Sequence, residues 1–176
     1  MSNVDKRNGF NLILSSGRQT RRVIRNVTAA GNPTNTLMPG DAYSIQADGT
    51  ITRATATTAT VNGIVEAMVL KGVNEGPISY DYAPAGVTID VIGIEDPQAE
   101  FECTATVALA LLDYDSGARV ALTDTTGQVS PAQSRQAIGA INGSGPFALI
   151  QPVDRVNNDK FAQYARVIVR IFNLIQ

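Results

Sequence analysis

Carboxylates gather in one short stretch of the 176-residue chain, where Glu95, Asp96, Glu100 and Glu102 follow one another closely. Two carboxylates held at a set separation can hydrolyse glycosidic bonds, one as acid and the other as base or nucleophile. Aromatic residues that would stack a sugar are sparse nearby, and Phe101 falls on an apolar strand face. We therefore expect these four acids to form a turn that contacts a neighbouring molecule, or a solvated loop, rather than a catalytic pair.

Other catalytic chemistry finds little support in the residue types. The chain has no histidine, which removes the commonest general base, the usual metal ligand and the serine triad. The one cysteine, Cys103, falls on the apolar face of an expected strand and is interpreted as a buried small hydrophobe. No glycine pattern forms a phosphate-binding loop. The sequence therefore predicts no enzyme, no cofactor and no metal.

One segment is similar to the opening of a calcium loop. Asp113 is followed by Asp115 and Gly117, but the twelfth position of such a loop, which needs a bidentate glutamate, holds Asp124. No flanking helices are expected, so we interpret the segment as a turn that enters a strand.

Charge is unevenly distributed along the chain. Residues 1–40 contain six basic residues and one acid, whereas residues 41–176 contain eight basic residues and fifteen acids. A basic segment ahead of an acidic body suggests that the segment contacts nucleic acid, a neighbouring copy or another protein, the alternative being a solvated loop. No stacking aromatics are interleaved, which disfavours nucleic acid. The basic residues expected to make this contact are Arg7, Arg18, Arg21, Arg22 and Arg25.

The acidic turn is expected to lie inside a central hairpin at residues 86–112. Apolar and polar residues alternate from Val87 to Val91 and again from Phe101 to Leu111, as in strands with one buried face. Between the two runs, Asp96 and Pro97 favour a turn, so the strands are expected to fold back on each other.

Short alternating runs separated by turn residues fill most of the remaining chain. Residues 10–27 predict two short strands, or an arm that becomes ordered only on a partner. The dipeptide Asp48-Gly49 indicates a tight hairpin. No apolar run approaches the ~18 residues of a membrane span, and the polar start lacks the apolar stretch of a signal peptide. We expect an extended basic arm at residues 1–39 and a β-rich body at 40–176.

An internal repeat relates residues 40–67 to residues 117–142. Both segments show a glycine, a strand, a glycine turn, a second strand, a polar loop and a strand that opens at glycine. The alternative is coincidence, because any β-rich chain offers such matches. A duplicated strand–turn–strand unit predicts an all-β fold with a compact β-barrel or sandwich body.

These strand units, and the segment from Val91 to Glu102 with its V-I-x-I-E-D-P-x-A-E-F-E pattern, resemble the head decoration or cement proteins of tailed bacteriophages. The resemblance covers residues 40–171. It implies a small β-rich protein on the outside of a capsid, often a homotrimer where capsomers meet, that bridges neighbouring subunits of the major capsid protein. It further implies a location on the virion surface after synthesis in the host cytoplasm, with the N-terminal arm reaching a neighbour. No membrane contact and no direct nucleic-acid binding are expected.

Three alternatives remain open at this point. A receptor- or glycan-binding module at the virion surface would use the Thr-rich stretch with Tyr80 and Tyr82. A hydrolase would use Glu100 and Glu102. A major shell or tail-tube subunit would need more helix or a longer chain than the sequence indicates.

Overall fold

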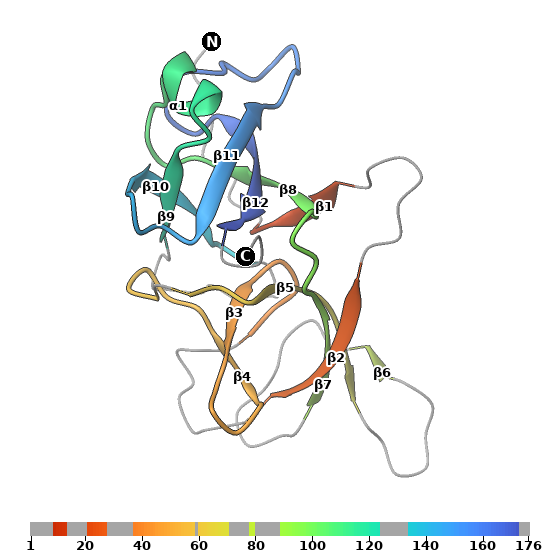
Figure 1. Ribbon diagram of the computed structural model, residues 1–176. Helices are drawn as coiled ribbons and strands as arrows, with labels where there is room; N and C mark the ends of the chain where they lie inside the picture. Colours follow the sequence, from red (N-terminus) through yellow and green to blue (C-terminus); the bar gives the residue numbers. More distant parts are fainter. Residues whose placement is uncertain are drawn as a thin grey trace.

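The structure is a computed structural model, and it describes residues 9–13, 21–27, 37–58, 60–70, 78–79, 89–123 and 134–172. Within these ranges the chain forms twelve strands and one short helix (Figure 1). The expected all-β fold is therefore confirmed.

Six strands form a first sheet that is antiparallel throughout. Their order across the sheet is β1 (Asn11–Ile13), β8 (Glu100–Thr104), β12 (Arg166–Ile171), β11 (Phe147–Pro152), β9 (Arg119–Thr123) and β10 (Ala137–Ile141). The helix α1 (Leu111–Asp115) packs against β11 at the end of this sheet that lies uppermost in Figure 1.

The other six strands form a second sheet, drawn below the first in Figure 1. Their order is β3 (Ala42–Ile45), β4 (Ile51–Arg53), β2 (Arg22–Val27), β7 (Ile89–Ile94), β5 (Gly63–Leu70) and β6 (Ile78–Ser79). Strands β2 and β4 are parallel and the other pairs are antiparallel. An additional pairing of β3 with β5 makes the sheet curl back on itself.

Alternation of apolar and polar residues explains why these segments become strands. In β12, Val167 and Val169 are buried, whereas Arg166 and Arg170 lie half-buried on the opposite face. The turn between β3 and β4 forms at Asp48-Gly49 as expected. Gly49 has a φ of +81°, a backbone conformation that glycine adopts easily and other residues rarely do. The Asp48 carboxylate accepts a hydrogen bond from the Thr50 N–H, which closes the turn.

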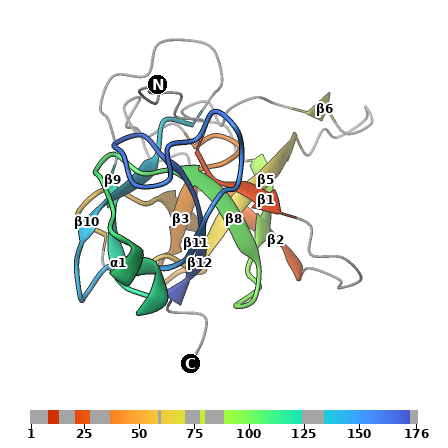
Figure 2. The ribbon, with the colours of Figure 1, turned by 90° about the horizontal axis from the view of Figure 1, so that it is seen from above.

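The main apolar core belongs to both sheets. It contains Phe147 and Val169 of the first sheet together with Ile64 and Ile94 of the second. Phe10, just before β1, stacks on Phe147 with ring centroids 4.5 Å apart. Figure 2, viewed from above, shows β11 and β12 lying over β3. The two sheets therefore share one interior and form a single body.

The central hairpin predicted at residues 86–112 is wrong. Strand β7 pairs with β2 and β5 in the second sheet, whereas β8 pairs with β1 and β12 in the first. Asp96 and Pro97 do form the predicted turn, but it carries the chain from one sheet to the other. The strand after this turn ends at Thr104, and Leu111 lies in α1. A local pattern fixes a turn but not the partner of the strand that follows it.

The separate N-terminal arm is also wrong for the part of residues 1–39 that the structure describes. Strand β1 pairs with β8, and β2 lies between β4 and β7 inside the second sheet. The alternative interpretation of this segment, two short strands, is confirmed.

The structure tests part of the predicted internal repeat, namely the first and third strands of each unit. Strand β3 pairs with β5 in the first copy, and β9 pairs with β10 in the second, so the first and third strands of each unit are antiparallel neighbours. The middle strand expected for the second copy, at residues 127–132, lies outside the described residues.

Candidate functional site

Four polar side chains are buried where the two sheets meet, and we call Asp41, Arg53, Ser134 and Gln136 the junction cluster. None of them is more than 5% exposed. Asp41 precedes β3 and Arg53 ends β4, whereas Ser134 and Gln136 precede β10. The cluster therefore joins segments that are about 80 to 95 positions apart in the sequence, and it does so across the sheet boundary.

Asp41 is the centre of the junction cluster. Its Oδ2 accepts hydrogen bonds from Arg53 Nε at 2.8 Å and from the Met38 N–H at 2.9 Å, and its Oδ1 accepts one from Ser134 Oγ at 2.5 Å. Burial raises the pKa of Asp41, while Arg53, Ser134 and the Met38 N–H act in the opposite direction. The carboxylate is thus removed from water but supplied with donors on both oxygens.

Gln136 extends the ladder between β3 and β4. Its Oε1 accepts a hydrogen bond from the Ala42 N–H at 2.6 Å, and its Nε2 donates one to the Ala54 carbonyl at 2.7 Å. The same two backbone segments are bonded to each other through the Ala54 N–H and the Ala42 carbonyl. A side-chain amide from the first sheet therefore satisfies backbone groups of the second, which would otherwise be buried without partners.

Within the junction cluster the Ser134 hydroxyl contacts the Asp41 carboxylate, which places a potential nucleophile beside a potential base. Ser134 is 1% exposed and Asp41 is not exposed at all. A substrate therefore has no access to this hydroxyl in the folded chain. The contact stabilises the junction.

A second buried polar contact lies on the inner side of the second sheet. The Tyr43 hydroxyl donates a hydrogen bond to Glu95 Oε1 at 2.8 Å. The Tyr43 ring lies over two glycines, because a Cβ built at Gly63 or Gly93 would lie 2.3 Å or 2.1 Å from the Tyr43 hydroxyl oxygen. These two positions need glycine to admit the ring.

The four acids of the predicted turn do not form one acidic tip. Glu95 and Asp96 are 5% and 4% exposed, so the contact with a neighbour predicted for these two residues does not fit the folded chain. Asp96 instead accepts backbone hydrogen bonds from the Arg21 and Gln98 N–H groups. Glu95 and Asp96 lie where the chain crosses from the second sheet to the first, and a charge buried there needs partners inside the protein.

Glu100 and Glu102 lie on one face of β8 and are paired with arginines. Glu100 contacts Arg170 at 2.5 Å, and Glu102 contacts Arg155 at 2.7 Å, with Arg166 at 3.9 Å. Both carboxylates are partly exposed, so a contact with a neighbour stays a prediction for these two residues. Their arginine partners argue against a free catalytic pair.

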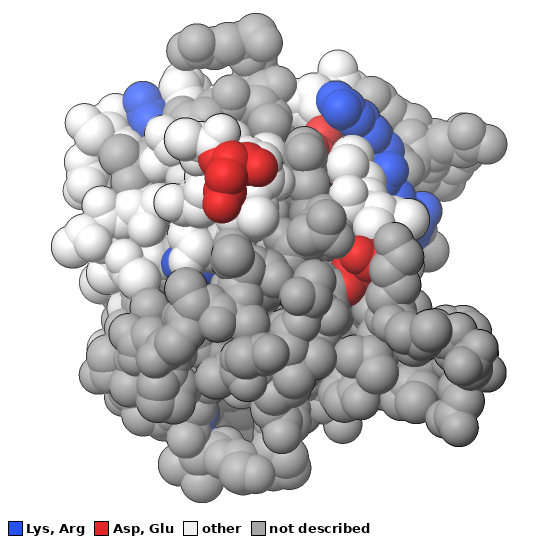
Figure 3. Space-filling view, turned by 90° about the horizontal axis from the view of Figure 1, so that it is seen from below, with Lys and Arg blue, Asp and Glu red and all other residues white. Residues whose placement is uncertain are grey.

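Of the five basic residues predicted to contact a partner, the three that the structure describes lie in or beside β2. Arg7 and Arg18 lie outside the described residues, and Arg25 belongs to β2, opposite Val91. Arg21 is exposed, and Arg22 makes a two-point ion pair with Glu66, which raises the pKa of Arg22 through hydrogen bonding and charge. Figure 3 shows basic side chains in a row along one edge of the described part of that face, with acidic side chains near the ends of the row.

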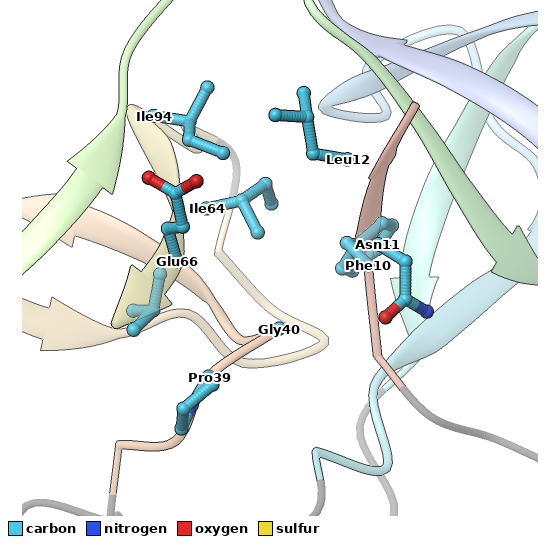
Figure 4. Close-up of a pocket in the computed structure, with 9 residues that line it drawn as sticks. Phe10, Asn11, Leu12, Pro39, Gly40, Ile64, Glu66 and Ile94 are labelled. Atoms are coloured by element: carbon cyan, nitrogen blue, oxygen red, sulfur yellow. The ribbon is translucent and has the colours of Figure 1, made fainter. Parts of the chain in front are cut away.

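A cleft of about 260 Å³ separates β1 from β5 and β7 (Figure 4). Leu12 faces Ile64 and Ile94 across it, and the Glu66 carboxylate lies at its mouth. Ile64 and Ile94 are each only 1% exposed, so their apolar surface is already covered. The cleft is smaller than the ~300–1,000 Å³ that a small-molecule site usually needs.

Exposed apolar side chains gather at the end of the first sheet that lies away from the second. Leu111 and Leu112 of α1 are 59% and 74% exposed, and Phe161, 46% exposed, lies edge-on to Tyr114 of the same helix. We call Leu111, Leu112 and Phe161 the apolar end. Neighbouring exposed apolar residues of this kind mark contact surfaces more often than single ones do.

The remaining candidates yield no site among the described residues. No group of three or more potential metal ligands occurs there. Burial raises the pKa of the Cys103 thiol, which keeps it protonated and unreactive. The segment from Asp113 to Gly117 closes α1 rather than forming a simple turn, and Tyr80 and Tyr82 lie outside the described ranges. The described helix is far too short to cross a membrane.

Comparisons with protein-family models, with curated proteins and with solved structures find no match for this chain.

The junction cluster was not predicted from the sequence, although one signal was present. Residues Ile51 and Arg53 occupy alternate positions of one strand, so alternation assigns Arg53 to the buried face. A charged residue at a buried strand position implies a buried partner. Nothing in the sequence identifies that partner as Asp41, or places Ser134 and Gln136 beside it.

Proposed function

We propose that this protein is a structural, non-enzymatic component of a tailed-phage virion that binds the outside of the capsid and bridges neighbouring subunits. Its partners would be the major capsid protein and further copies of itself, as a homotrimer on the capsid surface. The protein would be made in the host cytoplasm and would need no cofactor.

The observation that carries the proposal is that polar residues in the interior bond to one another and not to solvent. Asp41 binds Arg53 within the second sheet and Ser134 across the sheet boundary, at positions that no substrate reaches. An enzyme would expose such carboxylate and hydroxyl groups in a cleft, whereas here they stabilise the contact between the two sheets. A body fastened in this way suits a protein that transmits force between its neighbours.

The contact surface is the second support. The apolar end presents Leu111, Leu112 and Phe161 to solvent in the single chain. In a bridging protein such residues would be covered by a capsid subunit or by another copy. The resemblance of the strand units to cement proteins is the third support.

Sedimentation with purified shells of the phage that encodes the protein tests the proposal. We expect the chain to pellet with undecorated shells at a fixed ratio and to raise the temperature at which the shells break. Light scattering of the free protein would report whether it is a trimer. Failure to pellet with the shells would contradict the proposal.

A double variant, Leu111→Ser with Leu112→Ser, tests the contact surface. Both side chains are exposed, so the variant should fold with a stability within about 0.5 kcal/mol of the original, yet bind shells or other copies at least tenfold more weakly. Ile24→Thr, at an exposed position of β2 in the second sheet, is the matched control and should bind normally.

A further inference from the structure

Strand β1 is the edge of the first sheet, and one side of it has no strand neighbour among the described residues. It pairs with β8, where Asn11 lies opposite Glu102 and Leu12 opposite Phe101. The other side of β1 faces the cleft between β1 and β5 (Figure 4). An edge of this kind presents backbone donors and acceptors that a further strand can use.

The directions of the backbone groups follow from one hydrogen bond next to β8. The N–H of Ala105, just beyond β8, donates to the Ala165 carbonyl beside β12, so the odd-numbered residues of β8 point toward β12 and the even-numbered ones toward β1. Asn11 and Ile13, opposite Glu102 and Glu100, therefore bond to β8. The N–H and C=O of Leu12 point away from β8, toward the cleft.

The first position of a neighbouring strand is already occupied by this chain. The Phe10 N–H, which points to the same side as Leu12, donates to the Gly40 carbonyl at 2.9 Å. One step further along β1, the Leu12 groups have no bond of this kind in the described part of the chain. A strand added beside β1 would follow on from Gly40 into the cleft, and the position next to Leu12 is open to it.

We propose that the free side of β1 takes an extended, uncharged polypeptide segment of a partner protein, which adds a strand to the first sheet. The cleft floor is already covered, so an apolar small molecule would gain little there, whereas the backbone groups of Leu12 require the regular donors and acceptors of an extended chain. Glu66 is the one charged residue among the described residues that line the cleft, and it is paired with Arg22, so this lining offers no unpaired charge to a charged segment. The inference does not depend on the partner being a capsid subunit.

Amide exchange and peptide titration, followed by NMR on the ¹⁵N-labelled full chain, test the proposal. In the free protein the Leu12 N–H should exchange much faster than the N–H groups of Asn11 and Ile13. The probe is acetyl-Thr-Val-Thr-Val-Thr-amide, which should shift the Leu12 signal at millimolar concentration. A Leu12 N–H protected in the free protein, or unmoved by the peptide, would overturn the proposal.

Two N-methylated versions of the peptide make the test specific for strand addition. Backbone groups of a strand alternate in direction, so methylation at one position should weaken binding at least tenfold and methylation at the next should change it less than twofold. Equal effects at both positions would overturn the proposal. The variant Leu12→Pro removes the outward N–H and should not bind, whereas Leu12→Val should bind as the original chain does.

Discussion

The junction cluster and the apolar end are opposite kinds of surface. At the junction, charged and polar side chains lie where apolar ones would be expected, and bonds from Ser134 and Gln136 cross the sheet boundary. At the apolar end, leucines and a phenylalanine lie where polar side chains would be expected. The difference teaches that the junction cluster uses its polar groups inside the fold, whereas the apolar end leaves apolar side chains available for contacts.

Removing the charge of Arg53 should produce the largest loss of stability. The variant Arg53→Met keeps most of the side-chain volume but leaves Asp41 buried without its counter-charge, which typically costs about 3–5 kcal/mol. Urea unfolding monitored by circular dichroism measures the change in the free energy of unfolding.

The control for Arg53→Met is Arg155→Met, which breaks the ion pair with Glu102 at a position where Arg155 is 61% exposed. This loss should be below about 1 kcal/mol because water screens the pair. Equal losses in the two variants would contradict the special role of the junction.

Replacing Gln136 should have an effect of similar size. In Gln136→Met the Ala42 N–H and the Ala54 carbonyl lose their side-chain partner while remaining in the interior. Leaving a buried donor and acceptor unpaired costs about 1–3 kcal/mol for each group. Thermal unfolding followed by calorimetry would measure the loss, and Gln163→Met, which removes an exposed amide bonded to the Thr106 carbonyl, is the matched control.

A methyl group at Gly93 should destabilise the second sheet by about 1–3 kcal/mol, because it would overlap the Tyr43 hydroxyl. The variant Tyr43→Phe removes that oxygen, so Gly93→Ala should cost less in a Tyr43→Phe background than alone. A double-mutant cycle measures the coupling. Strictly additive effects would show that the ring and the glycine do not constrain each other.

The smallest expected effect is a change of stability with pH. The raised pKa of Asp41 means that the folded chain binds a proton more tightly than the unfolded chain, so this contribution to stability falls as pH rises from the ordinary value of 3.8 through the raised one. Asp48, whose pKa is lowered by hydrogen bonds from Thr50, contributes in the opposite sense: its stabilisation is present above pH 3.8 and is lost as pH falls. Unfolding curves of Asp41→Asn and Asp48→Asn across this range should deviate from the original chain with opposite slopes.

Much of the fold was predictable because it depends on local patterns. Alternation of valines with arginines is enough to assign the two faces of β12, and Asp48-Gly49 predicted the hairpin between β3 and β4. The path of the chain was not predictable, since Asp96 and Pro97 specify a turn in either a hairpin or a crossing between sheets. The choice depends on which strands lie next to β7 and β8, and one neighbour of each, β2 and β1, comes from the N-terminal segment that was expected to be an arm.

The candidate site was less predictable than the fold. Glu95 and Asp96 look in the sequence like part of an exposed acidic turn, but the crossing buries them. Asp41 and Ser134 are 93 positions apart, and only the packing of the two sheets brings them together. Sequence alternation assigns residues to faces, and it contains no information about which face meets which.

Amide hydrogen exchange across a series of urea concentrations tests most directly whether the junction cluster makes the two sheets one mechanical body. The account predicts that the slowest amides of β7 in the second sheet and of β12 in the first exchange with the same free energy, through one global unfolding. If one sheet opened at least about 2 kcal/mol below the other while the other stayed folded, the account would be contradicted.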